Sequence, residues 1–238
     1  DFGIIPFNEE IHGGRESYDE PVIMLGSCKA VRLTPSYPQL NPGVFFSEAN
    51  FKVQKWVEML GDEMLNNDII ETTIGDLVEG FDGELFIRPE TDLKLFAGMT
   101  VNHKEFVEWF GNNETRGEVE SAYPVSKESK VVASSPKNII GEWRCFIVNG
   151  KIISGSQYRN VGYTNHHESF PQEVQDYAEN VLKTWVPHDV CVADVAKLRD
   201  NSFRIIEFNC FNASGWYKSD QKKILKAVHD YVMESEND

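Results

Sequence analysis

The feature that most constrains the fold is an Asn149-Gly150 pair between two apolar runs, EWRCFIV and KIISGSQYR. Asn-Gly in this setting is the strongest short-range signal for a β-hairpin. A second pair of runs, DVCVADVAKL and SFRIIEFN, flanks a turn at Asp200-Asn201. Strands joined by such tight turns run antiparallel. The second half of the chain is therefore predicted to be α+β, with mainly antiparallel sheets.

The second hairpin brings two carboxylates together. With a two-residue loop at Asp200-Asn201, Asp194 is expected opposite Glu207, and Val192 opposite Asn209. Opposed side chains share a face with their Cβ atoms about 5 Å apart, and like charges placed so destabilise a sheet. We therefore predict a divalent cation, with Mg²⁺ as the candidate, bound by oxygen ligands from Asp194, Glu207 and Asn209. The alternatives are an ion pair from each acid to an arginine or lysine elsewhere, and a one-residue slip that separates the acids.

Basic residues suited to phosphate groups surround this pattern in the sequence. A two-residue turn in the first hairpin places Arg144 opposite Gly155, with Phe146 and Val148 on the same face as Arg144. An arginine in so apolar a run is costly unless it meets an anion, although snorkelling from an edge strand is the alternative. The further candidates are Arg88, Lys94 and Arg159.

Lys94 lies in the segment FIRPETDLKLFAG, which closes on Phe96-Ala97-Gly98. A mobile lid over phosphates would have this character. An ordinary solvated loop lysine is the alternative.

Composition limits the classes of partner. The net charge of −15 argues against a broad nucleic-acid or membrane surface, yet it allows a small anionic ligand in a locally basic pocket. No apolar run approaches the roughly 20 residues that a membrane helix needs, and no signal peptide is visible. The four cysteines are widely spaced, and we expect them to be reduced and buried in a cytoplasmic protein. The oligomeric state stays open.

The first third of the chain has α/β character. We predict a loop over residues 1–20, a strand over 21–26, a loop over 34–43, a helix over 49–65, a strand over 85–89, a helix over 103–110 and a polar loop over 111–129. A strand at 131–134, a helix after Pro171 and a last helix from near Ser219 complete the pattern. The expected division is an N-terminal α/β subdomain over 1–80 and a nucleotide-binding, catalytic region over 81–238.

An ordered set of short motifs points to a family. The set is Arg-Pro-x₄-Lys-x-Phe-x-Gly from Arg88, then Glu-Trp-Arg with a hairpin to Ser-x-Tyr-Arg, then Asp-Val-Ala, and finally Ile-Glu-Phe-Asn with Ser-Gly-Trp-Tyr. Over about residues 84–218 the chain resembles the ATP-grasp superfamily, and within it a phage-associated clade marked by arginine and lysine positions. The resemblance implies the ATP-grasp fold, with antiparallel sheets and flanking helices.

The resemblance also implies residue roles. It makes Asp194, Glu207 and Asn209 the magnesium ligands. It places Arg88, where many members carry lysine, together with Lys94, Arg144 and Arg159 at the phosphates and the acyl-phosphate. It assigns adenine binding to the backbone of Val132, Ala133 and Ser134. Glu142 contacts the ribose or is structural, and Ser214, Gly215, Trp216 and Tyr217 lie near the acceptor substrate.

The chemistry implied by the resemblance is carboxylate activation by ATP and Mg²⁺, followed by attack of an amine on an acyl-phosphate. The substrates would be small-molecule or peptide carboxylates and amines, in the cytoplasm of a phage host if the protein is phage-encoded. The alternatives are a phosphotransferase on the same fold, a non-catalytic ATP-binding regulatory phage protein, and a purely structural acidic domain. No P-loop or protein-kinase motif is present.

Overall fold

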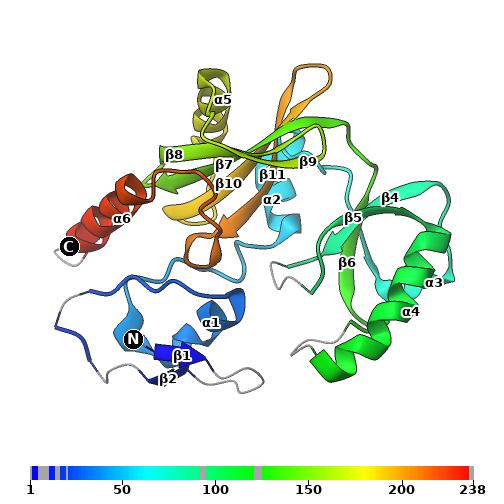
Figure 1. Cartoon of the computed structure of the whole chain (residues 1–238), viewed down its shortest axis with the longest axis horizontal. Helices are drawn as coiled ribbons and strands as arrows, with labels where there is room; N and C mark the ends of the chain where they lie inside the picture. The colour runs from blue at the N-terminus through cyan, green and yellow to red at the C-terminus, as the bar shows by residue number, and fades with distance from the viewer. Residues whose placement is uncertain are drawn as a thin grey trace.

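The computed structural model describes residues 2–4, 11–13, 17–19, 21–91, 95–120 and 125–235. Within these ranges the chain forms a five-stranded and a four-stranded antiparallel sheet, with helices packed on both, and a short hairpin of β1 (Phe2–Ile4) and β2 (Ile11–Gly13) (Figure 1). The predicted α+β class is confirmed. None of the described helices is both long and apolar enough to cross a membrane.

Both predicted hairpins lie in the five-stranded sheet, whose order is β11-β10-β7-β8-β9. Its strands are β7 (Ile139–Val148), β8 (Lys151–Asn160), β9 (Tyr163–His167), β10 (Val190–Leu198) and β11 (Phe203–Cys210). Asn149 and Gly150 have φ angles of 48° and 70°, which is the left-handed pair that a two-residue turn between twisted strands requires. The Asn-Gly signal therefore specifies this turn.

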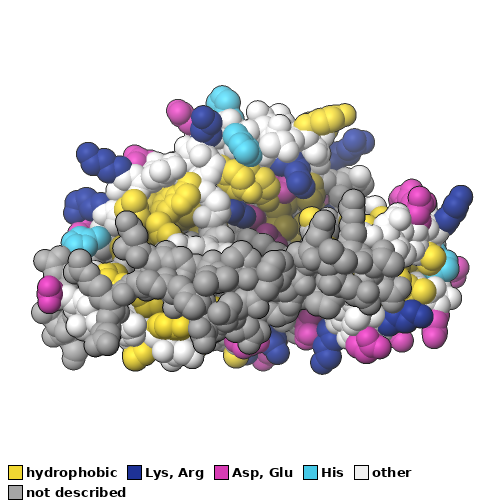
Figure 2. Space-filling view, turned by 60° about the horizontal axis from the view of Figure 1, so that its bottom comes forward, with side chains coloured by type: hydrophobic (Ala, Val, Ile, Leu, Met, Phe, Trp, Pro, Cys, Tyr) yellow, Lys and Arg dark blue, Asp and Glu magenta, His cyan; other side chains and the backbone are white. Residues whose placement is uncertain are grey.

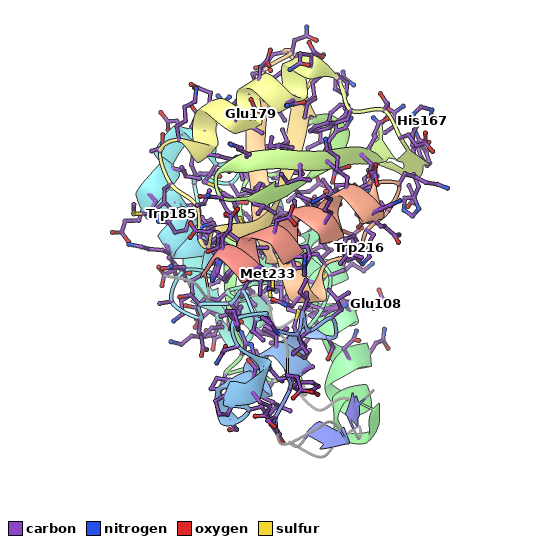
Figure 3. All side chains as sticks on the ribbon, turned by 90° about the vertical axis from the view of Figure 1, so that its left-hand side faces the viewer. Glu108, His167, Glu179, Trp185, Trp216 and Met233 are labelled. Atoms are coloured by element: carbon purple, nitrogen blue, oxygen red, sulfur yellow. The ribbon has the colours of Figure 1, made fainter. Side chains whose placement is uncertain are left out.

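The two faces of the five-stranded sheet pack against different helices. On one face Trp143, Cys145 and Ile147 lie in a core with α5 (Gln172–Leu182) and α2 (Val53–Leu60). On the other, Phe146 and Val148 pack against α6 (Gln221–Ser235). Figure 3 shows these helices through Glu179 on α5 and Met233 on α6.

The face under α6 changes character along β7. Its apolar half, including Phe146 and Val148, is covered by the helix, whereas two residues earlier the same face carries Arg144. Arg144 lies on a cavity wall, and so does Asp194 beside it on β10. Because side chains alternate along a strand, Arg144, Phe146 and Val148 share one face of β7. That face is core at Phe146 and Val148 and cavity wall at Arg144.

The four-stranded sheet has the order β3-β6-β4-β5. Its strands are β3 (Ile70–Thr73), β4 (Glu84–Pro89), β5 (Met99–Asn102) and β6 (Lys130–Ser134). Two helices, α3 (Ile74–Glu79) and α4 (His103–Glu120), contribute Ile74, Leu77, Phe106 and Phe110 to a separate core on this sheet. Because β3 pairs with β6, the four-stranded sheet contains strands from both sides of the expected domain boundary between residues 80 and 81.

The N-terminal part is tied to the end of β11 by one buried side chain. Asn212 donates from Nδ2 to Met24 O and Gly43 O at 2.8 Å each, and its Oδ1 accepts from Phe45 N at 2.8 Å. These bonds replace a sheet ladder, so the predicted strand over 21–26 is wrong. The segment packs so closely that a Cβ on Gly43 would lie 1.6 Å from Val22 O.

The remaining elements are short helices. They are α1 (Cys28–Leu33), η1 (Thr34–Ser36), η2 (Pro38–Leu40), η3 (Gly61–Glu63) and η4 (Phe211–Ala213). The predicted helix over 49–65 is shorter in α2, because Gly61 takes a φ of 51° and ends it. The predicted helix over 103–110 is too short and the predicted loop from 111 is wrong, since α4 continues through a polar but proline-free stretch to Glu120.

Candidate active site

A cavity of about 800 Å³ lies between the two sheets. Its walls come from β4, β7, β8, β10 and β11, with the segments around Gly98 and Gly215. The charged residues that line it are Arg88, Lys137, Glu142, Arg144, Arg159, Asp194 and Glu207. Basic groups therefore outnumber acidic ones here, although the whole chain carries a net charge of −15. The cavity suits an anionic ligand that brings its own cation.

The outer surface contrasts with this concentration of charge. Over the described part of the face drawn in Figure 2, Lys and Arg side chains are spread among Asp and Glu side chains. The positive charge of that face is therefore dispersed. The charged residues gathered in the cavity are therefore the feature that indicates a ligand-binding site.

The two acids lie where the sequence placed them. Asp194 is directly opposite Glu207, and Val192 is opposite Asn209. Asn209 Nδ2 donates to Glu207 Oε1 at 3.1 Å and lies 3.4 Å from Asp194 Oδ2. Two carboxylates and one amide thus meet on the wall of the cavity.

A buried arginine faces Asp194 from the neighbouring strand. Arg144 donates from Nε to Asp194 Oδ1 at 2.8 Å and from Nη2 to Oδ2 at 2.7 Å, while Nη1 donates to Gly215 O at 3.2 Å. Burial alone lowers the pKa of this guanidinium, but the Asp194 carboxylate outweighs that effect and raises the pKa above its usual value. Arg144 is therefore a fixed positive charge at any relevant pH.

The carboxyl group of Asp194 is perturbed in its turn. Burial raises its pKa, the adjacent Arg144 opposes the shift, and the nearby Glu207 and Glu142 carboxylates add to the rise. Such a group gains from further positive charge. This is the environment that a bound cation would relieve.

The structure corrects the expected partner of Arg144 across the first hairpin. Arg144 lies opposite Ser156, and it is Cys145 that lies opposite Gly155. A bulge between Phe146 and Ile147 shifts the register by one residue after the tight turn. The face that Arg144 occupies on β7 is nevertheless the predicted one, because the extra residue lies on β8.

A second arginine reaches the other acid across the space between the sheets. Arg88, from β4, places Nη1 2.9 Å from Glu207 Oε2 on β11. Its guanidinium carbon also lies 5.5 Å from the centre of the Trp56 ring. This contact joins the two sheets over the cavity.

Each acid therefore has an arginine partner, as the ion-pair alternative anticipated, but both pairs lie in the cavity. Among the described residues no group of three His, Cys, Asp or Glu side chains is arranged to hold a metal. The candidate set is two carboxylates and an amide, whose oxygens are the ligands that Mg²⁺ prefers. The arginines supply positive charge to the same oxygens, so the residues present fit a magnesium ion in donor type.

Glu142 and Arg159 form a third pair on the cavity wall. They lie opposite each other on β7 and β8, with Arg159 Nη1 3.3 Å from Glu142 Oε1. The Glu142 side chain is buried, while that of Arg159 is 48% exposed. Arg159 is thus the more exposed of the two, and its pairing with Glu142 is screened by solvent.

The expected adenine-binding residues Val132, Ala133 and Ser134 lie at the end of β6, and their role stays a prediction. Val132 and Ala133 are paired with β3 on one side and β4 on the other, whereas the described ladder pairs Ser134 only with Phe86 of β4. All three expected residues are buried and do not line the cavity. The expected Lys94 lies outside the described residues.

Two cavity residues were not singled out from the sequence. Lys137 follows the end of β6 and lies 2.9 Å from both carboxylate oxygens of Asp68, beside Ser135. Tyr158 lies under Arg144, with its ring centre 5.7 Å from the guanidinium carbon. A lysine just past a strand and a tyrosine two residues after Ser156 were the available signals, and both are weak alone.

Two antiparallel sheets that enclose a cavity rich in arginines and carboxylates are the ATP-grasp arrangement. The chain belongs to the ATP-grasp domain, in family 3 of its arginine/lysine clade (R-2-K), whose sequence pattern matches residues 30–228. The predicted superfamily and its arginine/lysine clade are confirmed, whereas the expected association with phages stays a prediction. Among curated proteins no match was found.

Solved structures share the fold. A RimK domain ATP-grasp protein from Sphaerobacter thermophilus has 9% identity and a TM-score of 0.55, over 87% of this chain and 78% of that one. D-cycloserine synthetase DcsG has 10% identity and a TM-score of 0.52, over 78% and 70%. The ATP-grasp ligase PsnB, complexed with a minimal precursor, has 13% identity and a TM-score of 0.49, over 79% of this chain and 61% of its own length. At these identities the likeness to the RimK domain protein and to DcsG concerns the fold alone, and the chain spans only about three fifths of the length of PsnB.

Proposed function

We propose that the protein is an ATP-dependent carboxylate–amine ligase that binds Mg-ATP in the cavity between the sheets. The observation that carries the proposal is the convergence of Asp194, Glu207 and Asn209 beside two arginines on one cavity wall. The family membership of the chain supports the same class of chemistry. The proposed substrates are a small-molecule or peptide carboxylate and an amine.

In the proposed reaction, a substrate carboxylate oxygen attacks the γ-phosphorus of ATP and ADP leaves. The amine nitrogen then attacks the acyl carbon, the bond from carbon to the phosphate oxygen breaks, and phosphate leaves as the amine loses a proton to water. Neither step needs a protein nucleophile. Positioning and offset of charge on the phosphoryl oxygens supply the catalysis.

Each charged residue has a proposed part in that offset. Bound at Asp194, Glu207 and Asn209, magnesium would supply positive charge to phosphate oxygens. Arg88 contacts the nucleotide phosphates, and Arg144 and Arg159 face the transferring phosphoryl group. Lys94 is proposed to close over the phosphates. The ATP phosphates would accept hydrogen bonds from arginine N–H groups that now donate to the carboxylates.

The ends of the cavity receive the other groups. Because the ladder between β6 and β3 stops at Ala133, we place the adenine against the end of β6 and the connection that follows it, beside Lys137 and Ile139 on the cavity wall. The acceptor substrate is proposed to lie by Gly215 and Tyr217 at the opposite wall.

The test is ADP release by the purified protein with ATP, Mg²⁺ and a panel of amino acids and short peptides. A ligase releases ADP with a carboxylate present and needs an amine for the amide product. A phosphorylated product that forms without amine supports a phosphotransferase. ATP binding without ADP release supports a regulatory binding protein, and both of the last two results contradict the proposal.

A further inference from the structure

Tyr217 has a backbone conformation that a bulky residue rarely adopts. Its φ angle is 49°, in the left-handed region, where the Cβ of an L-residue crowds the following carbonyl oxygen. Glycine or asparagine would relieve the crowding. Strain of this kind persists where the surrounding structure imposes it, often at functional sites. The question is what the conformation achieves.

The conformation places the Tyr217 ring on Arg144. The guanidinium carbon of Arg144 lies 4.8 Å from the ring centre. The same ring stacks on Tyr158, with centres 5.0 Å apart and an angle of 13°, and the ring centre of His166 lies 4.9 Å away. Tyr217 therefore joins the cavity wall and places its ring beneath the guanidinium carbon of Arg144, a contact that differs in kind from the hydrogen bonds of this group.

The loop that carries Tyr217 is anchored to β8 by the residues that follow the ring. Lys218 N donates to Ser156 Oγ at 3.3 Å, and Ser156 Oγ lies 3.0 Å from Ser219 Oγ. Asp220 N donates to Ser154 Oγ at 2.9 Å. Ser156 is itself opposite Arg144 in the ladder. The anchors therefore fix the loop to the strand that lies beside Arg144.

Arg144 is held on its edges as well. Nε and Nη2 each donate one hydrogen bond to the Asp194 carboxylate, and Nη1 donates one to the carbonyl oxygen of Gly215. An arginine has five N–H groups, so two remain for a ligand in the cavity. Where those two groups lie is determined by the plane of the guanidinium, which the Tyr217 and Tyr158 rings contact.

We propose that Tyr217 is a positioning residue: its ring fixes the plane of the Arg144 guanidinium so that the remaining N–H groups meet the transferring phosphoryl or acyl group. Its role in turnover rests on the proposed function. The ring, not the hydroxyl, carries the effect, and the strained backbone is retained because it holds the ring in place.

The test compares Tyr217→Leu, which removes the ring, with Tyr217→Phe, which keeps it. We expect Tyr217→Leu to lower kcat about 10²-fold with little change in the KM for ATP, and Tyr217→Phe to restore most of the rate. Phe203→Leu is the matched control, because Phe203 also stacks on a tyrosine and meets a cation, Lys197, but lies outside the cavity. It is expected to keep the wild-type kcat.

A second readout needs no turnover. Solvent exchange of the Arg144 Nε–H, assigned by its loss in Arg144→Lys, is expected to be slow in the wild type and at least tenfold faster in Tyr217→Leu. Unchanged exchange in Tyr217→Leu overturns the proposal, whether or not kcat falls. So does an unchanged kcat in an active enzyme. If the wild type releases no ADP, the proposed function fails and exchange alone decides the role of Tyr217.

Discussion

Two arginine–carboxylate pairs line the same cavity and differ in construction. Arg144 and Asp194 lie on adjacent strands of one sheet, make two hydrogen bonds, and have side chains only 8% and 2% exposed. Arg88 and Glu207 come from different sheets, meet at 2.9 Å, and have side chains 11% and 25% exposed. The first pair belongs to the fold of one sheet. The second depends on how the two sheets lie together.

Because the two pairs differ in burial and in the sheets they join, we expect them to have different roles. A largely buried two-point pair is a fixed charge, because separating it leaves an ion that is poorly solvated and without its partner. A single, more exposed contact exchanges partners more easily, since water can solvate both side chains once the pair opens. We therefore expect Arg144 and Asp194 to set the geometry of the site, and Arg88 and Glu207 to respond to the ligand.

The largest expected effect is on stability. Asp194→Ala leaves the Arg144 guanidinium buried without its carboxylate, and we expect a loss of about 3–5 kcal/mol in the free energy of unfolding. Glu207→Ala is expected to cost only about 1–2 kcal/mol, since the Glu207 side chain is 25% exposed and water can take its place beside Arg88. Urea unfolding of both variants checks the comparison. Equal losses would erase the distinction between the two pairs.

The next effect is on turnover. Glu207→Gln keeps an oxygen for Arg88 and relieves the repulsion with Asp194, so the fold should stay intact. Because a neutral amide binds a cation poorly, ADP release should fall about 10³-fold. Circular dichroism and ADP release on one sample give the answer. A variant that unfolds, or one that keeps its rate, counts against a ligand-binding role for Glu207.

Lysine substitutions sharpen the contrast further. Arg144→Lys replaces a planar two-point donor by a point charge, and we expect kcat to fall about 10²-fold. Arg88→Lys keeps the charge at a single contact, so activity should remain within about tenfold of the wild type. Steady-state kinetics with varied ATP measures both. The reverse order would place the geometric constraint on Arg88.

The smallest effect concerns the pair of Asp68 and Lys137, near the connection between the sheets. Partial burial raises the pKa of Asp68, but hydrogen bonds from Ser135 and Lys137 outweigh it and lower the pKa below its usual value. A lowered folded-state pKa gives stability that is present above the unfolded pKa and lost as pH falls through the folded one.

Asp68→Asn should therefore lose less than about 1 kcal/mol at neutral pH, because the Asp68 side chain is 40% exposed and solvent screens the pair. It should also show a smaller loss of stability than the wild type as the pH falls below the unfolded pKa of an aspartate, about 3.9. Thermal unfolding at several pH values measures this. An effect as large as that of Asp194→Ala would mean that the connection is not solvated as the structure has it.

The two hairpins show how far sequence reasoning reaches. In the second, Leu198 N donates to Ser202 O, so the loop has three residues and not the two assumed. A bulge between Asp194 and Val195 then restores the predicted pairing at the acids. In the first, the turn was right and a bulge moved the partner of Arg144 by one residue. Bulges depend on packing, which alternation alone does not encode.

The part of the site that lies within one hairpin was predictable from the sequence, and the part that depends on packing between sheets was not. Period two placed Asp194, Glu207 and Asn209 on one face. The contact of Arg88 with Glu207 was beyond reach, because it depends on how two separate sheets pack. The pairing of Val132 on both sides was likewise not predictable, since both of its neighbouring strands, β3 and β4, lie far from it in the sequence.

The central claim is that the two carboxylates and the amide hold Mg-ATP in this cavity. Its most direct test is the melting temperature with ATP, in Mg²⁺ and in EDTA. At about 100 times the dissociation constant, binding to the folded state adds about 2.7 kcal/mol, which corresponds to a rise of roughly 5–10 °C for a chain of this size. We predict that rise in the wild type with Mg²⁺, little in EDTA, and little in Glu207→Gln. A rise that is equal in all three, or none in the wild type, would contradict the account.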